Sequence, residues 1–137
     1  MPIKFSLVDN DEHLLQTLKL GIESLGEFIC VGCHVDAEEA LAGITRDPVD
    51  VVLMGSQIPG VSGIEYLQRL KTGRPNLAVI MLTDTVDDDT IHQAMQSGAA
   101  GYLVKPVRPG VCAAAMRATM RGGKPWCRTS FVSPTHA

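Results

Sequence analysis

Short apolar runs alternate along the chain with longer segments in which apolar residues recur every three or four positions. The runs are rich in Val, Ile and Leu and nearly continuous, which is typical of strands covered on both faces. They predict five parallel β-strands, at 3–8, 28–33, 49–54, 77–82 and 101–104. The segments with helical spacing predict five α-helices, at about 11–25, 37–46, 63–72, 86–97 and 109–121.

The residues at the ends of these segments support the same division. Two pairs have the spacing of a helix-capping box, Asp36 with Glu39 and Ser62 with Glu65. Pro109 suits the first turn of a helix. Three of the predicted helices are followed by a glycine, which readily adopts the left-handed backbone conformation that often ends a helix. These glycines are Gly26, Gly98 and Gly122. Five such strand-helix units predict an α/β fold, in which a parallel sheet carries helices on both faces.

The length of the chain indicates one domain. Its 137 residues suffice for a single core, and with 45% hydrophobic and 20% charged residues the composition is that of a globular protein. The periodic pattern stops after Gly122, so we expect a domain at 1–122 and a tail or the start of a linker at 123–137. No apolar run is long enough to cross a membrane and the start lacks the pattern of a secretory signal. We therefore expect a cytoplasmic protein with no membrane partner.

Charge is distributed unevenly along the sequence. Residues 1–89 hold all 15 Asp and Glu residues but only six of the 12 Lys and Arg residues, and the net charge is −3. The dispersed basic residues of the remainder are weak evidence for nucleic-acid binding, which usually needs a concentrated basic face. They fit either a solvated surface or a contact with an acidic patch of another chain.

Four cysteines are too few and too scattered for a disulfide framework. Cys30 and Cys33 have the C-x-x-C spacing of a redox or zinc motif, but they lie inside a predicted strand and no second cluster completes a zinc site. We interpret them as ordinary packed cysteines.

Polar residues gather where the predicted strands end. In a parallel sheet these ends lie at one edge, which is where ligands and reacting groups are found. The first, third, fourth and fifth strands are followed or ended there by Asp9-Asn10-Asp11-Glu12, Gly55-Ser56-Gln57, Thr83-Asp84 and Lys105-Pro106. Acid, hydroxyl and ammonium groups are thus expected to converge on this edge.

Four motifs over residues 3–122 resemble the receiver domain of bacterial two-component response regulators: LVDNDEHL, VDVVLMGSQIPGVSGIEYLQRLK, VIMLTD and GAAGYLVKP. The resemblance implies the flavodoxin-like (βα)5 fold, a three-layer sandwich with strand order 2-1-3-4-5. It also implies that a histidine kinase passes a phosphoryl group to an Asp at the end of the third strand, with the help of Mg²⁺. A Thr or Ser and a Lys then hold the phosphoryl oxygens.

Two of the residues that this family requires are missing. Thr83, Lys105 and Asp9 match the motif, but Asn10 stands in place of the second acidic residue and Gly55 in place of the phosphoacceptor. Glycine cannot form an acyl phosphate, and Mg²⁺ prefers several oxygen ligands, so we expect metal binding to be weak or absent, with Asp9 as the residual ligand. With fewer carboxylates to repel it, Asp9 can pair directly with Lys105.

The sequence therefore predicts a receiver-like signalling module, not an enzyme, that acts independently of phosphate transfer and regulates an output, most naturally transcription. The ending AMRATMRGGKPW resembles receivers that precede a helix-turn-helix DNA-binding domain, so DNA would be reached only through such a domain. Three alternatives stay open. The chain could be a phosphoacceptor in modified or engineered form, with Ser56 or Asp84 as substitute acceptor. It could bind an anion at Thr83, Lys105 and the vacant space of Gly55. It could also bind a flavin, although aromatic residues are only 4%.

The resemblance also implies an output face. In this family Thr83 and an aromatic residue of the fifth strand, here Tyr102, act as the switch. Acidic residues at the start of the fourth helix and basic residues of the fifth could meet their counterparts across a two-fold axis, and those residues are Asp87, Asp88, Asp89, Arg117 and Arg121. We expect a homodimer through this face, with a histidine kinase or another signalling protein as a further partner. Alternatively, the acids only stabilise the helix start, and Tyr102 only covers the sheet edge.

Overall fold

Five parallel strands form the central sheet in the computed structural model, which describes residues 2–55, 57–58, 61–84 and 88–122. The strands lie in the order β2-β1-β3-β6-β7, which is 2-1-3-4-5 when only the strands of this sheet are counted. Their bounds are β1 Ile3–Val8, β2 Phe28–His34, β3 Val51–Gly55, β6 Ala78–Thr83 and β7 Gly101–Val104. The predicted strands and their flavodoxin-like order are confirmed, and each boundary lies within two residues of the expected position.

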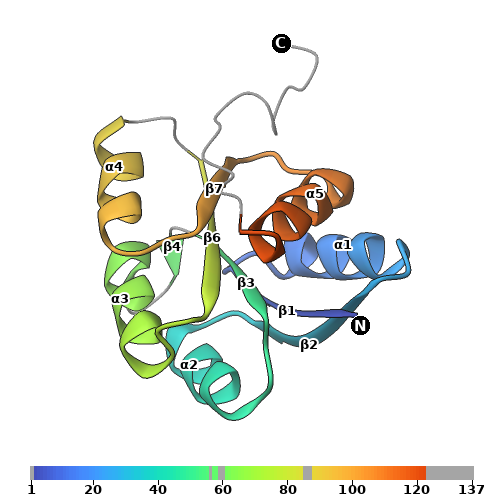
Figure 1. The fold of residues 1–137 in the computed structure, drawn as a ribbon, viewed down its shortest axis with the longest axis horizontal. Coiled ribbons are helices and arrows are strands. Elements are labelled where there is room, and N and C mark those ends of the chain that lie inside the picture. The colour runs from blue at the N-terminus through green and yellow to red at the C-terminus, as the bar shows by residue number, and fades with distance from the viewer. Residues whose placement is uncertain (1, 56, 59–60, 85–87, 123–137) are drawn as a thin grey trace.

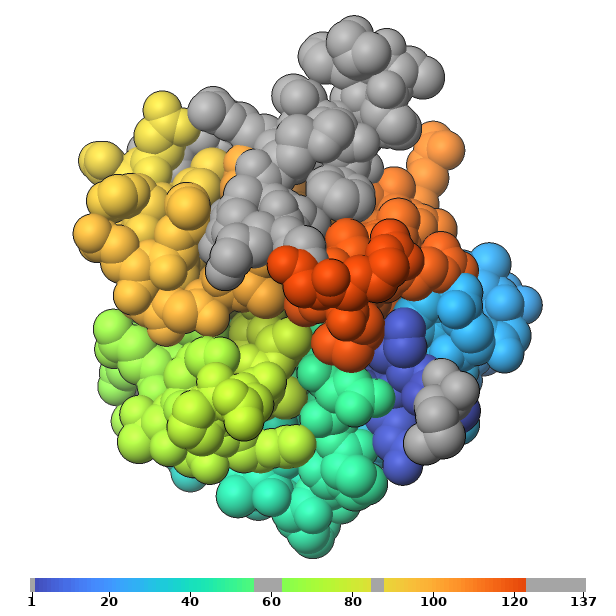
Figure 2. All heavy atoms as spheres, viewed as in Figure 1, coloured from blue at the N-terminus to red at the C-terminus, as the bar shows by residue number. Residues whose placement is uncertain are grey.

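Five helices cover the two faces of the sheet (Figure 1). On one face lie α2 (Ala37–Arg46), α3 (Gly63–Gly73) and α4 (Asp88–Gln96), and on the other lie α1 (Glu12–Glu23) and α5 (Pro109–Met120). Each predicted helix is present. The space-filling view shows the surface of α5 meeting that of α1 on one side of the molecule (Figure 2).

Alternate residues of each central strand supply two separate cores, because successive side chains of a strand point to opposite faces. In β3, Val52 and Met54 pack toward α2, α3 and α4, whereas Val51 and Leu53 pack toward α1 and α5. All four are fully buried. This is why the strands appear in the sequence as continuous apolar runs, with no polar face.

Most of the residues predicted to begin or end helices do so in the structure. The Asp36 side chain accepts a 2.8 Å hydrogen bond from the backbone N–H of Glu39, as expected for a capping residue. Pro109 occupies the first turn of α5. The glycines after α1, α4 and α5 all have positive φ, at Gly26, Gly98 and Gly122. The side chain of Ser62, which we expected to cap α3, lies outside what the structure describes.

Two short strands were not predicted. β4 (Gln57–Ile58) and β5 (Val61–Ser62) pair antiparallel after β3. A strand of two residues is too short to show an alternating pattern in the sequence. Among the helices of the described residues, none is long and apolar enough to cross a membrane. The expected tail at 123–137 lies outside the described residues.

Candidate functional site

The structure brings the predicted polar residues together at the carboxyl edge of the sheet. Asp9 follows β1, Gly55 ends β3, Thr83 ends β6 and Lys105 follows β7. Because β1, β3 and β6 are neighbours in register, their ends lie side by side. These are the elements on which the sequence analysis placed the site.

Asp9 and Lys105 form a direct ion pair at this edge. Lys105 Nζ donates to Asp9 Oδ2 at 2.8 Å, and the backbone N–H of Asp11 donates to Asp9 Oδ1 at 3.0 Å. The Asp9 side chain is only 1% exposed and that of Lys105 is 21% exposed. Both carboxylate oxygens of Asp9 therefore accept hydrogen bonds. A buried charge needs such partners, because its burial is otherwise costly. The predicted pairing of these two residues is present.

Gly55 is the reason that Asp9 can lie where it does. A Cβ atom built on Gly55 would be 2.4 Å from Asp9 Oδ2 and 3.0 Å from Asp9 Cγ. Carbon and oxygen atoms do not approach this closely without a bond, so any side chain at position 55 would displace the Asp9 carboxylate from this position. The carboxylate of β1 occupies the space that a β3 side chain would otherwise fill.

Lys105 is held in place by its backbone as well as by its side chain. Its N–H donates to the carbonyl oxygen of Thr83 at 2.7 Å, which extends the pairing of β6 with β7 past the last strand residue. The Lys105 side chain then reaches across to β1. Lys105 thereby connects the ends of β6 and β7 with the segment that follows β1, across the end of β3.

The remaining residues of the predicted site are either exposed or have side chains that the structure does not describe. Asn10 and Asp84 are exposed. They line an open depression of about 540 Å³ beside the ion pair, together with Asp11, Leu14, Lys105, Pro106 and Val107. Gln57 lies in β4, but its side chain is not described, and neither is Ser56.

The residues at this edge do not fit a Mg²⁺ ion. Such an ion binds one or two carboxylates directly and keeps several waters in octahedral geometry. The one buried carboxylate, that of Asp9, already accepts from an ammonium and an amide. Within the described part of the chain, no group of three or more His, Cys, Asp or Glu residues could hold a metal ion.

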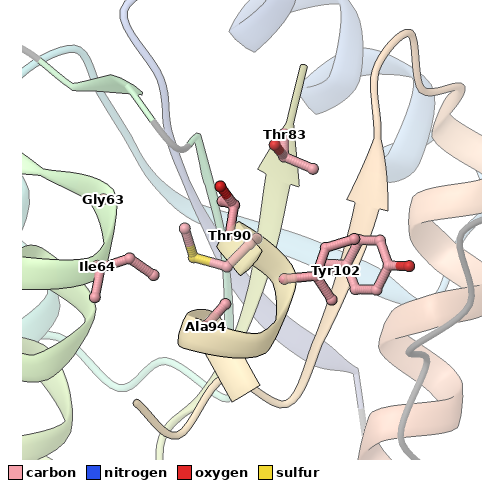
Figure 3. Close-up of a pocket in the computed structure, with 8 residues that line it drawn as sticks. Gly63, Ile64, Thr83, Thr90, Ala94 and Tyr102 are labelled. Carbon is pink, nitrogen blue, oxygen red and sulfur yellow. The ribbon is translucent and has the colours of Figure 1, made fainter. Parts of the chain in front are cut away.

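The two predicted switch residues line a small apolar pocket between the sheet and α4. Figure 3 shows Thr83 at the end of β6 above Thr90 and Ala94 of α4, with the Tyr102 hydroxyl directed away from them. Thr83 and Tyr102 are each 3% exposed. The pocket holds about 100 Å³ and is lined by Gly63, Ile64, Met81, Thr83, Thr90, Ile91, Ala94 and Tyr102. Its α3 and α4 residues could not be predicted from the sequence, because the pattern of a helix face does not show which of its members leave a gap.

The predicted dimer residues differ in their surroundings. Arg117 forms an ion pair with Glu27, and its guanidinium carbon lies 5.2 Å from the centre of the Phe28 ring. It is thus engaged within its own chain at the start of β2. Asp88 and Asp89 are exposed in the first turn of α4, and Arg121 is exposed at the end of α5. Asp87 lies outside the described residues.

Comparison with known proteins agrees with the fold. A family model described as the response regulator receiver domain matches residues 5–117. The strand order is that of the flavodoxin-like receiver fold. The chain belongs to the receiver domain family of two-component response regulators. Its curated relatives include a response regulator and a transcriptional regulatory protein.

Two curated relatives and one solved structure illustrate the match. The chain is 32% identical to the response regulator UvrY of Escherichia coli over 127 residues, which cover 88% of this chain and 55% of that protein. It is 30% identical to the transcriptional regulatory protein QseB of Haemophilus influenzae over 121 residues, covering 87% and 53%. The chain thus spans about half the length of these relatives. An isolated receiver domain of RcsB from Salmonella enterica, solved with the phosphomimetic BeF3−, superposes with a TM-score of 0.85 at 19% identity, covering 98% of both chains.

Proposed function

We propose that this receiver domain signals without phosphate transfer and regulates its output through protein contacts. The observation that carries the proposal is the arrangement of Gly55, Asp9 and Lys105. Position 55 ends β3 and offers no carboxylate, and the Asp9 carboxylate lies in the space of the absent side chain, bound to Lys105 at 2.8 Å. The edge contains an internal ion pair where the family motif has a reaction centre.

Two chemical requirements of phosphorylation are opposed by this arrangement. A nucleophilic carboxylate must approach phosphorus with a free oxygen, but both oxygens of Asp9 accept hydrogen bonds. The ammonium that would stabilise the transferred oxygens is already neutralised by Asp9. For these reasons the structure favours the phosphorylation-independent receiver over a modified phosphoacceptor.

The proposal includes the setting in which the domain works. We place the receiver at 1–122, with 123–137 as a tail or linker, in the cytoplasm. Its partners would be a second copy of the chain, bound through the face of α4, β7 and α5, and a histidine kinase or another signalling protein. Because the curated relatives are about twice as long, and QseB is named as a transcriptional regulatory protein, we assign transcription to a further DNA-binding domain.

Incubation with acetyl phosphate and Mg²⁺, followed by intact mass, tests the proposal. We expect the mass of the chain to stay unchanged, because position 55 has no carboxylate and both oxygens of Asp9 accept hydrogen bonds. The positive control is the double variant Gly55→Asp, Asn10→Asp, which restores the carboxylates of the family motif. A Cβ at position 55 requires Asp9 to move, so this variant should accept a phosphoryl group only where Mg²⁺ draws Asp9 away from Lys105. A phosphoryl group on the unmodified chain would contradict the proposal.

A further inference from the structure

Cys30 and Cys33 lie close together on β2, on the side of the sheet that α1 and α5 cover. Their Sγ atoms are 3.7 Å apart and in hydrogen-bonding contact. Both side chains are partly buried against the core beneath α1 and α5, and partly open to solvent. The C-x-x-C spacing, which we interpreted as incidental in a strand, thus produces a pair of adjacent thiols.

A β-bulge is what brings the two sulfurs to the same face. Residues three apart in a regular strand point to opposite faces of the sheet. In the pairing of β1 with β2, Phe5 is opposite Cys30 but Ser6 is opposite Gly32, so Val31 is an extra residue. The bulge turns Cys33 to the side of Cys30. The irregularity that creates the pair lies within the C-x-x-C motif itself.

The two thiols differ in acidity. The pKa of Cys33 is lowered to about 7, first because Cys30 shares a hydrogen bond with its sulfur and then because the Lys19 ammonium favours the thiolate. Burial and Glu23 oppose this shift. The pKa of Cys30 is raised by the same hydrogen bond and by burial. In such an asymmetric pair, the more acidic thiol is suited to attack a disulfide as a thiolate. The less acidic thiol can then attack the mixed disulfide that results.

A third cysteine in the described residues provides the contrast. Cys112 is fully buried in α5, and burial raises its pKa to about 12. It has no sulfur neighbour among the interactions found in the described part of the chain. A thiol of this kind is inert, so reactivity at the Cys30 and Cys33 pair is a property of its position and not of cysteines in this chain generally.

We propose that Cys30 and Cys33 form a dithiol site that reacts with small disulfides and closes into an intramolecular disulfide. The Cys33 thiolate attacks one sulfur of the disulfide, forming a mixed disulfide and releasing a thiolate. Cys30 loses its proton to solvent and attacks the Cys33 sulfur, which releases the second small thiol. The chain is oxidised by two electrons, and the small disulfide is reduced to two thiols.

The position of β2 permits the closure. The sulfurs must approach from 3.7 Å to about 2.05 Å, the length of an S–S bond. β2 is an edge strand with β1 as its one neighbour in the sheet, so a shift at the bulge disturbs only one ladder of hydrogen bonds. Cys33 follows Gly32, which adapts its backbone at low cost.

Treatment of the full chain with glutathione disulfide tests the site. A Cys127→Ser background removes the cysteine outside the described residues. We expect the product to lose two hydrogen atoms in mass, with Cys30 and Cys33 joined in one peptide and Cys112 still reduced. In this background Cys30→Ser should stop at a glutathione adduct on Cys33, because the second attack is lost. Cys33→Ser should react at least roughly tenfold more slowly.

Two results would overturn the site. One is a background protein in which both thiols stay open to alkylation after oxidant has been added. The other is a glutathione adduct on Cys33 that persists while Cys30 is present. Near-ultraviolet and far-ultraviolet circular dichroism of each serine variant establishes that it is folded before its reactivity is compared.

Discussion

At the residue scale, the missing side chain of Gly55 has an effect beyond the loss of a nucleophile. It leaves space that the Asp9 carboxylate enters, at 2.4 Å from where a Cβ would lie, and there Asp9 meets Lys105. A buried carboxylate is costly unless it is paired, so the glycine, the aspartate and the lysine depend on one another. This coupling makes the ion pair a structural element of the domain.

Removing the lysine is therefore expected to destabilise the fold. Lys105→Ala leaves Asp9 buried, with the backbone N–H of Asp11 as its remaining hydrogen-bond donor among the described residues, and breaking a buried pair in this way costs about 3 kcal/mol. The free energy of unfolding from urea denaturation measures the loss. The double variant Asp9→Asn, Lys105→Ala removes the unpaired charge and should recover more than half of it. A single variant as stable as the unmodified protein would contradict a structural role for the pair.

The sequence predicted the members of this site but not all of their contacts. Opposite charges at the ends of two strands were enough to predict that Asp9 would pair with Lys105. The charge pattern did not reveal that Arg117 pairs with Glu27 and stacks on Phe28, because residues 90 apart meet only once the helices are packed. The same holds for the pocket residues of α3 and α4, since an apolar helix face does not show which of its members leave a gap.

At the element scale, hydrophobic periodicity predicted the central strands and helices within a few residues. Continuous apolar runs that alternate with helices are typical of parallel strands buried on both faces, and the connections through those helices are right-handed. Local chemistry then placed the boundaries, as the Asp36 cap of α2 shows. What the pattern missed was irregularity: the short pair β4 and β5, and the bulge at Val31.

The bulge shows why such a miss matters for function. A regular strand places Cys30 and Cys33 on opposite faces. From the sequence we interpreted them as ordinary packed cysteines, because they lie inside a predicted strand and no second cluster completes a zinc site. One extra residue in β2 reverses that conclusion. Strand propensity does not identify this bulge, because Val31 is a good strand residue. Only the register of β2 against β1 shows that Val31 has no partner.

At the scale of the whole molecule, the uneven charge of the chain bears on assembly. Acidic residues of α4 and the basic end of α5 are both exposed, whereas Arg117 is engaged with its own chain. The proposed dimer is therefore best tested at Arg121. We expect Arg121→Glu to weaken dimerisation about tenfold, which is about 1.4 kcal/mol, as measured by sedimentation at several protein concentrations.

The paired and control variants make that test specific. Adding Asp88→Arg to Arg121→Glu exchanges the charges and should restore the dimer if the two residues face each other across the axis. Arg46→Glu changes an exposed arginine at the end of α2 and should leave the mass unchanged. Equal masses for Arg121→Glu and the unmodified protein over the whole dilution series would rule out this interface.

The most direct test of the account is whether the unmodified protein binds Mg²⁺ with beryllofluoride, the phosphomimetic present in the RcsB receiver structure. Anything that binds the folded state raises the midpoint of thermal unfolding with ligand concentration. Because Asp9 already holds Lys105 and position 55 has no carboxylate, we predict the same midpoint with and without the two ligands. A saturable rise in the midpoint that requires both ligands would contradict the central claim that this receiver works without phosphate.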